Sequence, residues 1–280
     1  MVTFSLQALP DDATGWLDLA RRAEDLGFDA LYVADHPGAC ASPFVALAAA
    51  AAVTSRLRLG SYVSNAGVRE PILLASDVAT LDVVSGGRAI LGLGAGHTPA
   101  EWEAIGKVRP DVRGRIDHCL AVAEATTRML AGDGMEKPRP VQERVPLLIG
   151  GGNTRLLRWA GEHADLIGLS GLGRTLPDGH MHETRWGAGA IDAQVELCNG
   201  KPIEALVQRV VETDDGGAAY AAMAAEFEED ETELIAAPYV LAGTRGEIAA
   251  KIAEVGRRWG ITRFAVRLPA IDTVAGLIGT

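Results

Sequence analysis

Short apolar runs alternate with longer segments of helical period along the whole chain. The short runs have the length of strands, and the longer segments repeat apolar positions every three or four residues. This alternation, with no linker between units, is typical of a parallel α/β fold. The predicted strands are 4–7, 28–33, 57–63, 89–91, 145–149, 164–169, 204–212 and 261–268, and the predicted helices include 16–26, 43–53, 71–85, 115–130, 156–163 and 245–259.

Eight strands alternating with helices predict a (β/α)8 TIM barrel that spans residues 1–280 as one domain. Barrels of this class need about 250 residues, so the chain has the length for one. Residues 171–187 are rich in glycine and polar side chains and show no clean period. We therefore expect an insertion loop on the C-terminal face of the barrel, where the catalytic loops of such folds lie.

The segment 57–96 is the most informative part of the chain. Pro71 stands at the first position of its helix, and Gly86-Gly87 stops that helix before a strand that runs into the glycines of 92–96. In its order of motifs the segment closely resembles the luciferase-like family of flavin and deazaflavin oxidoreductases. The shared residues are Arg69, Pro71, Ala75, Ala79, Thr80, Leu81, Asp82, Ser85, Gly87, Arg88 and Gly92 to Gly96.

The resemblance extends over essentially the whole chain, including the pattern at 237–244 near its end. It is strongest to oxidoreductases that use the 5-deazaflavin coenzyme F420. It implies an enzyme that moves a hydride between the deazaflavin C5 and a small organic substrate, which the sequence does not identify. Two alternatives stay open: an FMN-dependent monooxygenase on the same barrel, and a homologue that binds deazaflavin or flavin without catalysis.

The net charge of −11 argues against a nucleic-acid partner, which would require a basic surface for the phosphates. The longest apolar run, 44–53, is too short to cross a bilayer, so no membrane association is expected. No signal peptide is evident, and the three cysteines form no paired framework, which favours the cytoplasm. The acidic residues of 226–233 are interpreted as a solvated helix end or loop.

Asp35 and His36 end the second predicted strand, at the face where barrels place catalytic residues. Histidine is suited to proton transfer near neutral pH, and Asp35 could orient it or adjust its pKa. The structural alternative is a histidine that caps the turn before Pro37. The resemblance favours the catalytic role, because deazaflavin-dependent members carry Asp-His here, near the cofactor ring.

Gly150, Gly151, Gly152 and Asn153 follow the fifth strand and open a helix. Glycines let the backbone approach a phosphate, and the free N–H groups of a helix N-terminus attract it. The alternative is a tight turn without a ligand, and the resemblance favours a cofactor phosphate site. Ser170, which follows the strand 164–169, is assigned to the same cofactor site.

Gly94, Ala95 and Gly96 end the fourth strand and fail the dinucleotide fingerprint, because His97 stands where a glycine would be required. Close packing at the barrel rim is one explanation for these glycines. The resemblance implies instead that they line the pocket beneath the cofactor ring. Some deazaflavin dehydrogenases have a catalytic acid just after this turn, and His97 is predicted to occupy that position.

Tyr62, Val63, Ser64 and Asn65 end the third strand. In many members of the resembled family a bulge with a non-prolyl cis peptide backs the cofactor ring at this point. The resemblance therefore implies cofactor contacts from all four residues and a cis bond at Tyr62-Val63.

A metal site is not predicted. Three potential metal ligands lie close together in the sequence at His180, His182 and Glu183. A metal-dependent hydrolase barrel, however, would carry His-x-His after the first strand, where this chain has Gln7-Ala8. Assembly is predicted from the alanine-rich helix 43–53, whose apolar face suits a two-fold homodimer of the kind common in the resembled family.

Overall fold

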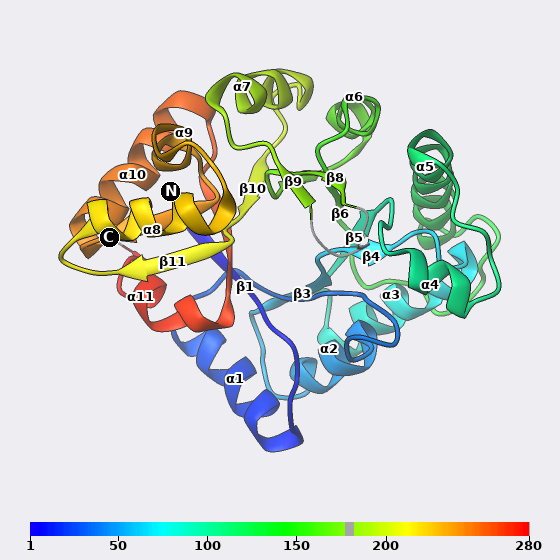
Figure 1. Cartoon of the computed structure of the whole chain (residues 1–280). Helices are drawn as coiled ribbons and strands as arrows, with labels where there is room; N and C mark the ends of the chain where they lie inside the picture. Colours follow the sequence, from blue (N-terminus) through cyan, green and yellow to red (C-terminus); the bar gives the residue numbers. More distant parts are fainter. Residues whose placement is uncertain (177–181, 280) are drawn as a thin grey trace.

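Parallel strands close into a barrel in the computed structural model, which describes residues 1–176 and 182–279. The strands follow each other around the axis, and the pairing of β3 with β5 closes the ring, with the short β4 beside β5 (Figure 1). The (β/α)8 prediction is therefore confirmed. The barrel strands are β1 (Thr3–Gln7), β2 (Ala30–Val33), β3 (Arg58–Ser61), β4 (Ser64–Asn65), β5 (Ala89–Gly94), β6 (Leu147–Gly150), β7 (Leu166–Leu169), β10 (Ile203–Leu206) and β13 (Arg263–Arg267).

The helices form a ring around the strands (Figure 1). Their buried residues and the outward side chains of the strands make one large apolar core, to which alanines contribute close helix contacts. The helices are α1 (Ala13–Asp25), α2 (Pro43–Ala51), α3 (Pro71–Ser85), α4 (Pro99–Ala104), α5 (Val112–Leu130), α6 (Thr154–His163), α7 (Ala188–Leu197), α8 (Gly216–Phe227), α9 (Glu231–Ala236), α10 (Arg245–Trp259) and α11 (Ile271–Ala275), with a 3-10 turn at Leu268–Ala270.

The family motif around α3 holds the strand ends in place. The Asp82 carboxylate accepts hydrogen bonds from the backbone of Ala89, Val141 and Gln142. The Arg88 guanidinium donates to the carbonyl oxygens of Ala51 and Leu57. These buried charges are fully hydrogen-bonded, so this part of the motif serves the fold rather than the chemistry.

The predicted strand 204–212 is wrong as a single element. Its first half is the barrel strand β10, and its second half is β11 (Arg209–Glu212), which pairs with β12 (Val240–Gly243) in a separate two-stranded sheet. The separation occurs at Gln208, whose backbone N–H donates to Tyr239 O and not to the barrel. The apolar residues on both sides of Gln208 look alike in the sequence and did not reveal this change of partner.

The insertion contains an antiparallel hairpin, β8 (Leu172–Thr175) with β9 (His182–Thr184). Figure 1 shows it across the end of the barrel. Residues 177–181, including His180 of the metal-like sequence, lie outside the described residues. Among the described residues no cluster of three potential metal ligands is present, and no described helix is long and apolar enough to span a membrane.

Candidate active site

The C-terminal end of the barrel is organised around a break between β3 and β4. The Tyr62-Val63 peptide bond is cis, as the resemblance implied. The Tyr62 carbonyl accepts a 2.7 Å hydrogen bond from Gln7 Nε2, and the Tyr62 hydroxyl donates to Glu204 O at 3.1 Å inside the barrel. The Tyr62 ring is therefore buried, whereas Val63 at this break is partly exposed.

Glycines of three neighbouring strands pack against this break. A Cβ on Gly94 or Gly150 would lie 2.5 or 2.8 Å from a methyl group of Val63, and one on Gly168 would lie 2.5 Å from the Tyr62 ring. All three distances are shorter than normal carbon contacts. Close packing thus explains Gly94 and Gly150 directly, because the Val63 methyl groups fill the space that their Cβ atoms would need.

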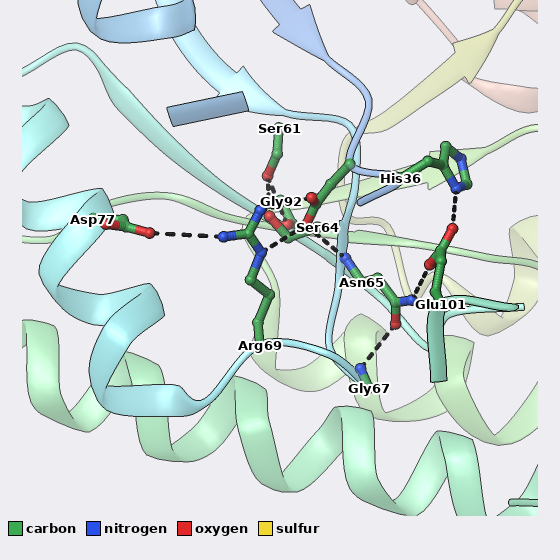
Figure 2. A network of polar contacts seen from close by, with 10 residues as sticks. His36, Ser61, Ser64, Asn65, Gly67, Arg69, Asp77, Gly92 and Glu101 are labelled. Carbon is green, nitrogen blue, oxygen red and sulfur yellow. Dashed lines mark hydrogen bonds and ion pairs between the residues drawn. The ribbon is translucent and has the colours of Figure 1, made fainter. Parts of the chain in front are cut away.

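Asp35 and Arg69 fix the loop that follows β4, in which Figure 2 labels Arg69. The buried Asp35 carboxylate accepts hydrogen bonds from Arg69 Nη2 at 2.7 Å, from Arg69 Nε at 3.0 Å and from Asn65 N at 3.2 Å. The Arg69–Asp35 pair has bidentate geometry, which resists rotation of both groups. Asp35 therefore holds the backbone of β4 in place, and a different carboxylate contacts His36.

That carboxylate belongs to Glu101, on the short helix α4. His36 Nδ1 lies 2.7 Å from Glu101 Oε1, and Asn65 Nδ2 donates to Glu101 Oε2 (Figure 2). The Glu101 side chain is 5% exposed, whereas that of His36 is 37% exposed. The pair thus has a buried, hydrogen-bonded acid and a histidine that reaches solvent or a ligand.

The charges of this pair stabilise each other. The Glu101 hydrogen bond raises the pKa of His36, against an opposing effect of burial. Burial raises the pKa of Glu101, but hydrogen bonds from His36 and Asn65 outweigh it, and the net direction is downward. An ionised Glu101 accepts the Nδ1 proton of His36, which leaves His36 Nε2 for proton exchange with a ligand.

His97 lies between two other histidines. Its ring makes edge contacts with His36 at 5.4 Å and with His182 of β9 at 4.4 Å between centroids. Burial and the charges of these neighbours lower the pKa of His97 to about 4. Near neutral pH His97 is therefore uncharged, and the acid in contact with His36 is Glu101, four residues after His97.

Glu101 was missed although the sequence carries a signal for it. Thr98-Pro99 followed by Glu101 is a typical helix start, with proline at the first position and an acid two residues later. Thr98 forms no side-chain cap in the structure. The Glu101 carboxylate binds His36 and Asn65 instead of closing a capping box, and only the tertiary structure shows that choice.

The glycine run 150–152 opens the N-terminus of α6. Asn153 Oδ1 caps the helix by accepting from Arg155 N at 2.9 Å, and Gly151 N donates to Gly168 O at 3.0 Å. The backbone N–H groups of Gly152, Asn153 and Thr154 have no acceptor within 1–176 and 182–279. Three consecutive free donors at a helix N-terminus are suited to a phosphate.

Two side chains predicted near the ligand, those of Ser64 and Ser170, are engaged within the chain, and so is Arg155 beside the glycine run. The fully buried Ser64 hydroxyl donates to Ser61 Oγ, which removes Ser64 from a cofactor-contacting surface. Ser170 lies at the end of β7, and its hydroxyl accepts from Leu172 N. Arg155 forms a 2.6 Å ion pair with Asp117 on α5, so its charge is already compensated. Ala95 and Gly96 are half-buried beside His97.

The family model for luciferase-like monooxygenases matches residues 4–194. The chain belongs to the luciferase-like family. A curated relative, the 5,10-methylenetetrahydromethanopterin reductase of Methanopyrus kandleri, is 43% identical over 34% of this chain and 27% of its own length. The F420-dependent glucose-6-phosphate dehydrogenase of Kineococcus radiotolerans is 30% identical over 57% of this chain and 53% of its own. The matches thus span about a quarter to a half of these relatives.

Solved structures agree with this luciferase-like fold. An F420-dependent secondary alcohol dehydrogenase in complex with an F420-acetone adduct has a TM-score of 0.74 at 20% identity, covering 99% of this chain and 98% of the other. Monooxygenases and an FMN-containing protein are also among the matches. The curated relatives thus include an F420-dependent enzyme.

Proposed function

We propose that this protein uses coenzyme F420 to transfer a hydride to or from a small organic substrate, with His36 and Glu101 handling the accompanying proton. The observation that carries the proposal is the 2.7 Å contact between His36 and a buried Glu101, next to the Tyr62-Val63 break. F420-dependent relatives support the choice of cofactor.

The residues present fit such a cofactor. The break at Val63, where the neighbouring glycines let the strand ends pack closely and Val63 and Gly150 stay partly exposed, provides a surface on which a flat ring can lie. The free N–H groups of residues 152–154 fit its phosphate. The cofactor supplies a carbon centre, C5, that exchanges a hydride, which side chains cannot do.

The side chains of the protein carry out the proton transfer that accompanies the hydride transfer. Transfer of a hydride to or from a carbon that bears oxygen changes the charge on that oxygen, which a nearby acid or base must balance. His36 exchanges the proton through Nε2, and Glu101 keeps the ring oriented and stabilises its protonated form. Asn65 holds the Glu101 carboxylate in position, and Asp35 holds the β4 backbone in position, so both act as positioning residues.

A turnover screen tests the proposal. Small alcohols, aldehydes and activated alkenes would be supplied with oxidised or reduced F420 under anaerobic conditions, and deazaflavin absorbance would be followed. A substrate-dependent absorbance change that His36→Ala strongly reduces supports the proposal. Oxygen-dependent product formation with reduced FMN, and none with F420, would establish the monooxygenase alternative, which a monooxygenase among the curated relatives favours.

We also propose that the protein forms a homodimer. Most apolar side chains of α2 are buried within the chain, contrary to the flat free face expected for 43–53. Five of the exposed apolar side chains lie on α2 and α3, namely Val45, Ile72, Leu73, Val83 and Val84. A second copy that covers these residues would bury apolar surface that monomers rarely expose.

A further inference from the structure

A cavity of about 310 Å³ lies at the amino-terminal mouth of the barrel, opposite the His36 site. Its walls come from the first residues of strands and from the loops that lead into them. Arg58 begins β3, Arg263 begins β13, and Leu166 begins β7. The volume is at the lower end of the range for small-molecule sites. The luciferase-like chemistry at the other end of the barrel does not use it.

Three arginines line this cavity, in a protein whose net charge is −11. Arg144 forms a 3.2 Å ion pair with Asp165, which also lines the cavity, and Arg263 Nη2 binds Asp29. Arg58 has no ion pair and no side-chain hydrogen bond within the described part of the chain. One guanidinium thus faces the cavity without compensation.

Two buried polar atoms beside the cavity also lack partners. Arg263 Nε is inaccessible to solvent and has no acceptor among the described residues, and the same holds for Thr3 Oγ1. Thr3 is the register partner of Arg263 on the neighbouring strand. Because neither atom is reached by solvent, neither faces the cavity, and the Arg263 side chain, which is 22% exposed, lines the cavity through its other atoms.

A buried carboxylate next to Arg263 already has its hydrogen-bond partners inside the barrel. Glu204 is the register partner of Arg263 on its other side and is fully buried. Its two oxygens accept hydrogen bonds from Ser5 Oγ at 2.6 Å and Tyr32 OH at 2.9 Å. The Glu204 carboxylate is engaged within the barrel and its charge acts on Arg263, so the guanidinium that remains for a ligand on the cavity side is that of Arg58.

We propose that this cavity binds a compact phosphate group, either inorganic phosphate or the phosphate of a small ester. Guanidinium groups bind phosphate oxygens with paired N–H donors, and two arginines from β3 and β13 with one from the loop before β6 surround the space. Apolar walls from Ile90, Leu166 and Pro202 lower the local dielectric and suit a short carbon skeleton. The ligand would tie together strand ends that are distant in sequence.

Thermal unfolding of the whole chain tests this site. Inorganic phosphate and glycerol 3-phosphate would each be titrated at constant ionic strength, with chloride as reference. At ten times its Kd, a bound phosphate should raise Tm by about 2–3 °C. Stabilisation by both probes or by phosphate alone supports the inorganic form, and stabilisation by the ester alone supports the organic form. No stabilisation beyond chloride overturns the proposal.

Two variants locate the effect. Arg58→Gln should weaken phosphate binding at least tenfold, whereas Arg56→Gln, two residues away and exposed, should not change it. Asn153→Asp places a negative charge at the α6 N-terminus on the opposite face, and should leave this stabilisation in place. If Arg58→Gln retains the wild-type phosphate response, or if Asn153→Asp abolishes it, the ligand binds elsewhere and the proposal fails. Isothermal titration of the same variants measures affinity independently of stability.

Discussion

Replacement of Glu101 by glutamine removes one charge and preserves the shape of the side chain. The amide keeps one acceptor oxygen, which can still face His36 as in Figure 2, while its nitrogen faces Asn65 Nδ2, so His36 loses its charged partner and Asn65 loses one acceptor. A hydrogen bond to a charged group contributes about 1.5–3 kcal/mol. Because the His36 side chain is 37% exposed, solvent screening favours the lower part of this range, about 1.5–2 kcal/mol. The expected loss of kcat is therefore roughly 10- to 30-fold.

The same variant should shift the pH profile. Glu101 raises the pKa of His36, so the protonated form persists to higher pH in the wild type. Without the carboxylate the pKa of His36 falls, and the step that needs protonated His36 is lost at lower pH. The alkaline limb of the pH profile of kcat should therefore shift to lower pH in Glu101→Gln. Glu103→Gln, on the exposed side of the same helix, is the matched control. Equal kinetics and equal profiles for both variants would refute the role of Glu101.

Three further predictions concern the proton, the phosphate and the assembly. His36→Ala should lower turnover by about 10²–10⁴ while F420 affinity stays within severalfold, and loss of affinity at an unchanged rate per complex would make His36 a ring-binding residue. Asn153→Asp can still cap α6 but should weaken F420 binding about tenfold by charge repulsion, whereas the neutral cap in Asn153→Ser should not. Equal affinities of the two variants in a fluorescence titration would mean that the cofactor phosphate does not bind at this helix. Sedimentation should show a dimer that Leu73→Asp dissociates, and a wild-type monomer at micromolar concentration would contradict the proposed interface.

Gly151 is a less suitable position for testing the phosphate site. Its φ of +149° lies in a region that side chains rarely adopt, and a Cβ would lie 2.6 Å from Leu156 Cδ2. Replacing it by valine would strain the backbone and the packing of α6 as well as block a ligand. Weaker cofactor binding in such a variant would therefore have two causes, which the Asn153 pair of variants separates.

Local patterns predicted much of the fold because local physics determines those parts. Pro71 and Gly86 begin and end α3 as expected, since a proline fixes the first turn and a glycine adopts the left-handed conformation after the last. The cis bond at Tyr62-Val63 came from the family resemblance, and residue chemistry alone would not have located it.

The remaining features depend on contacts between distant residues. Asp35 and Glu101 are both acids near strand ends, but only the folded chain pairs Asp35 with Arg69 and Glu101 with His36. The division of 204–212 at Gln208 depends on Tyr239, more than 30 residues later in the sequence. Serine at position 64 likewise gave no indication that its hydroxyl would be buried against Ser61.

Direct titration of the purified protein with F420 and with FMN tests the central claim. Binding of each would be followed by fluorescence under identical conditions, with Asn153→Asp as the second sample. We expect saturable binding of F420 at least about tenfold tighter than that of FMN, and a weaker F420 affinity in the variant. Tighter binding of FMN than of F420, or no binding of F420 at all, would contradict the account.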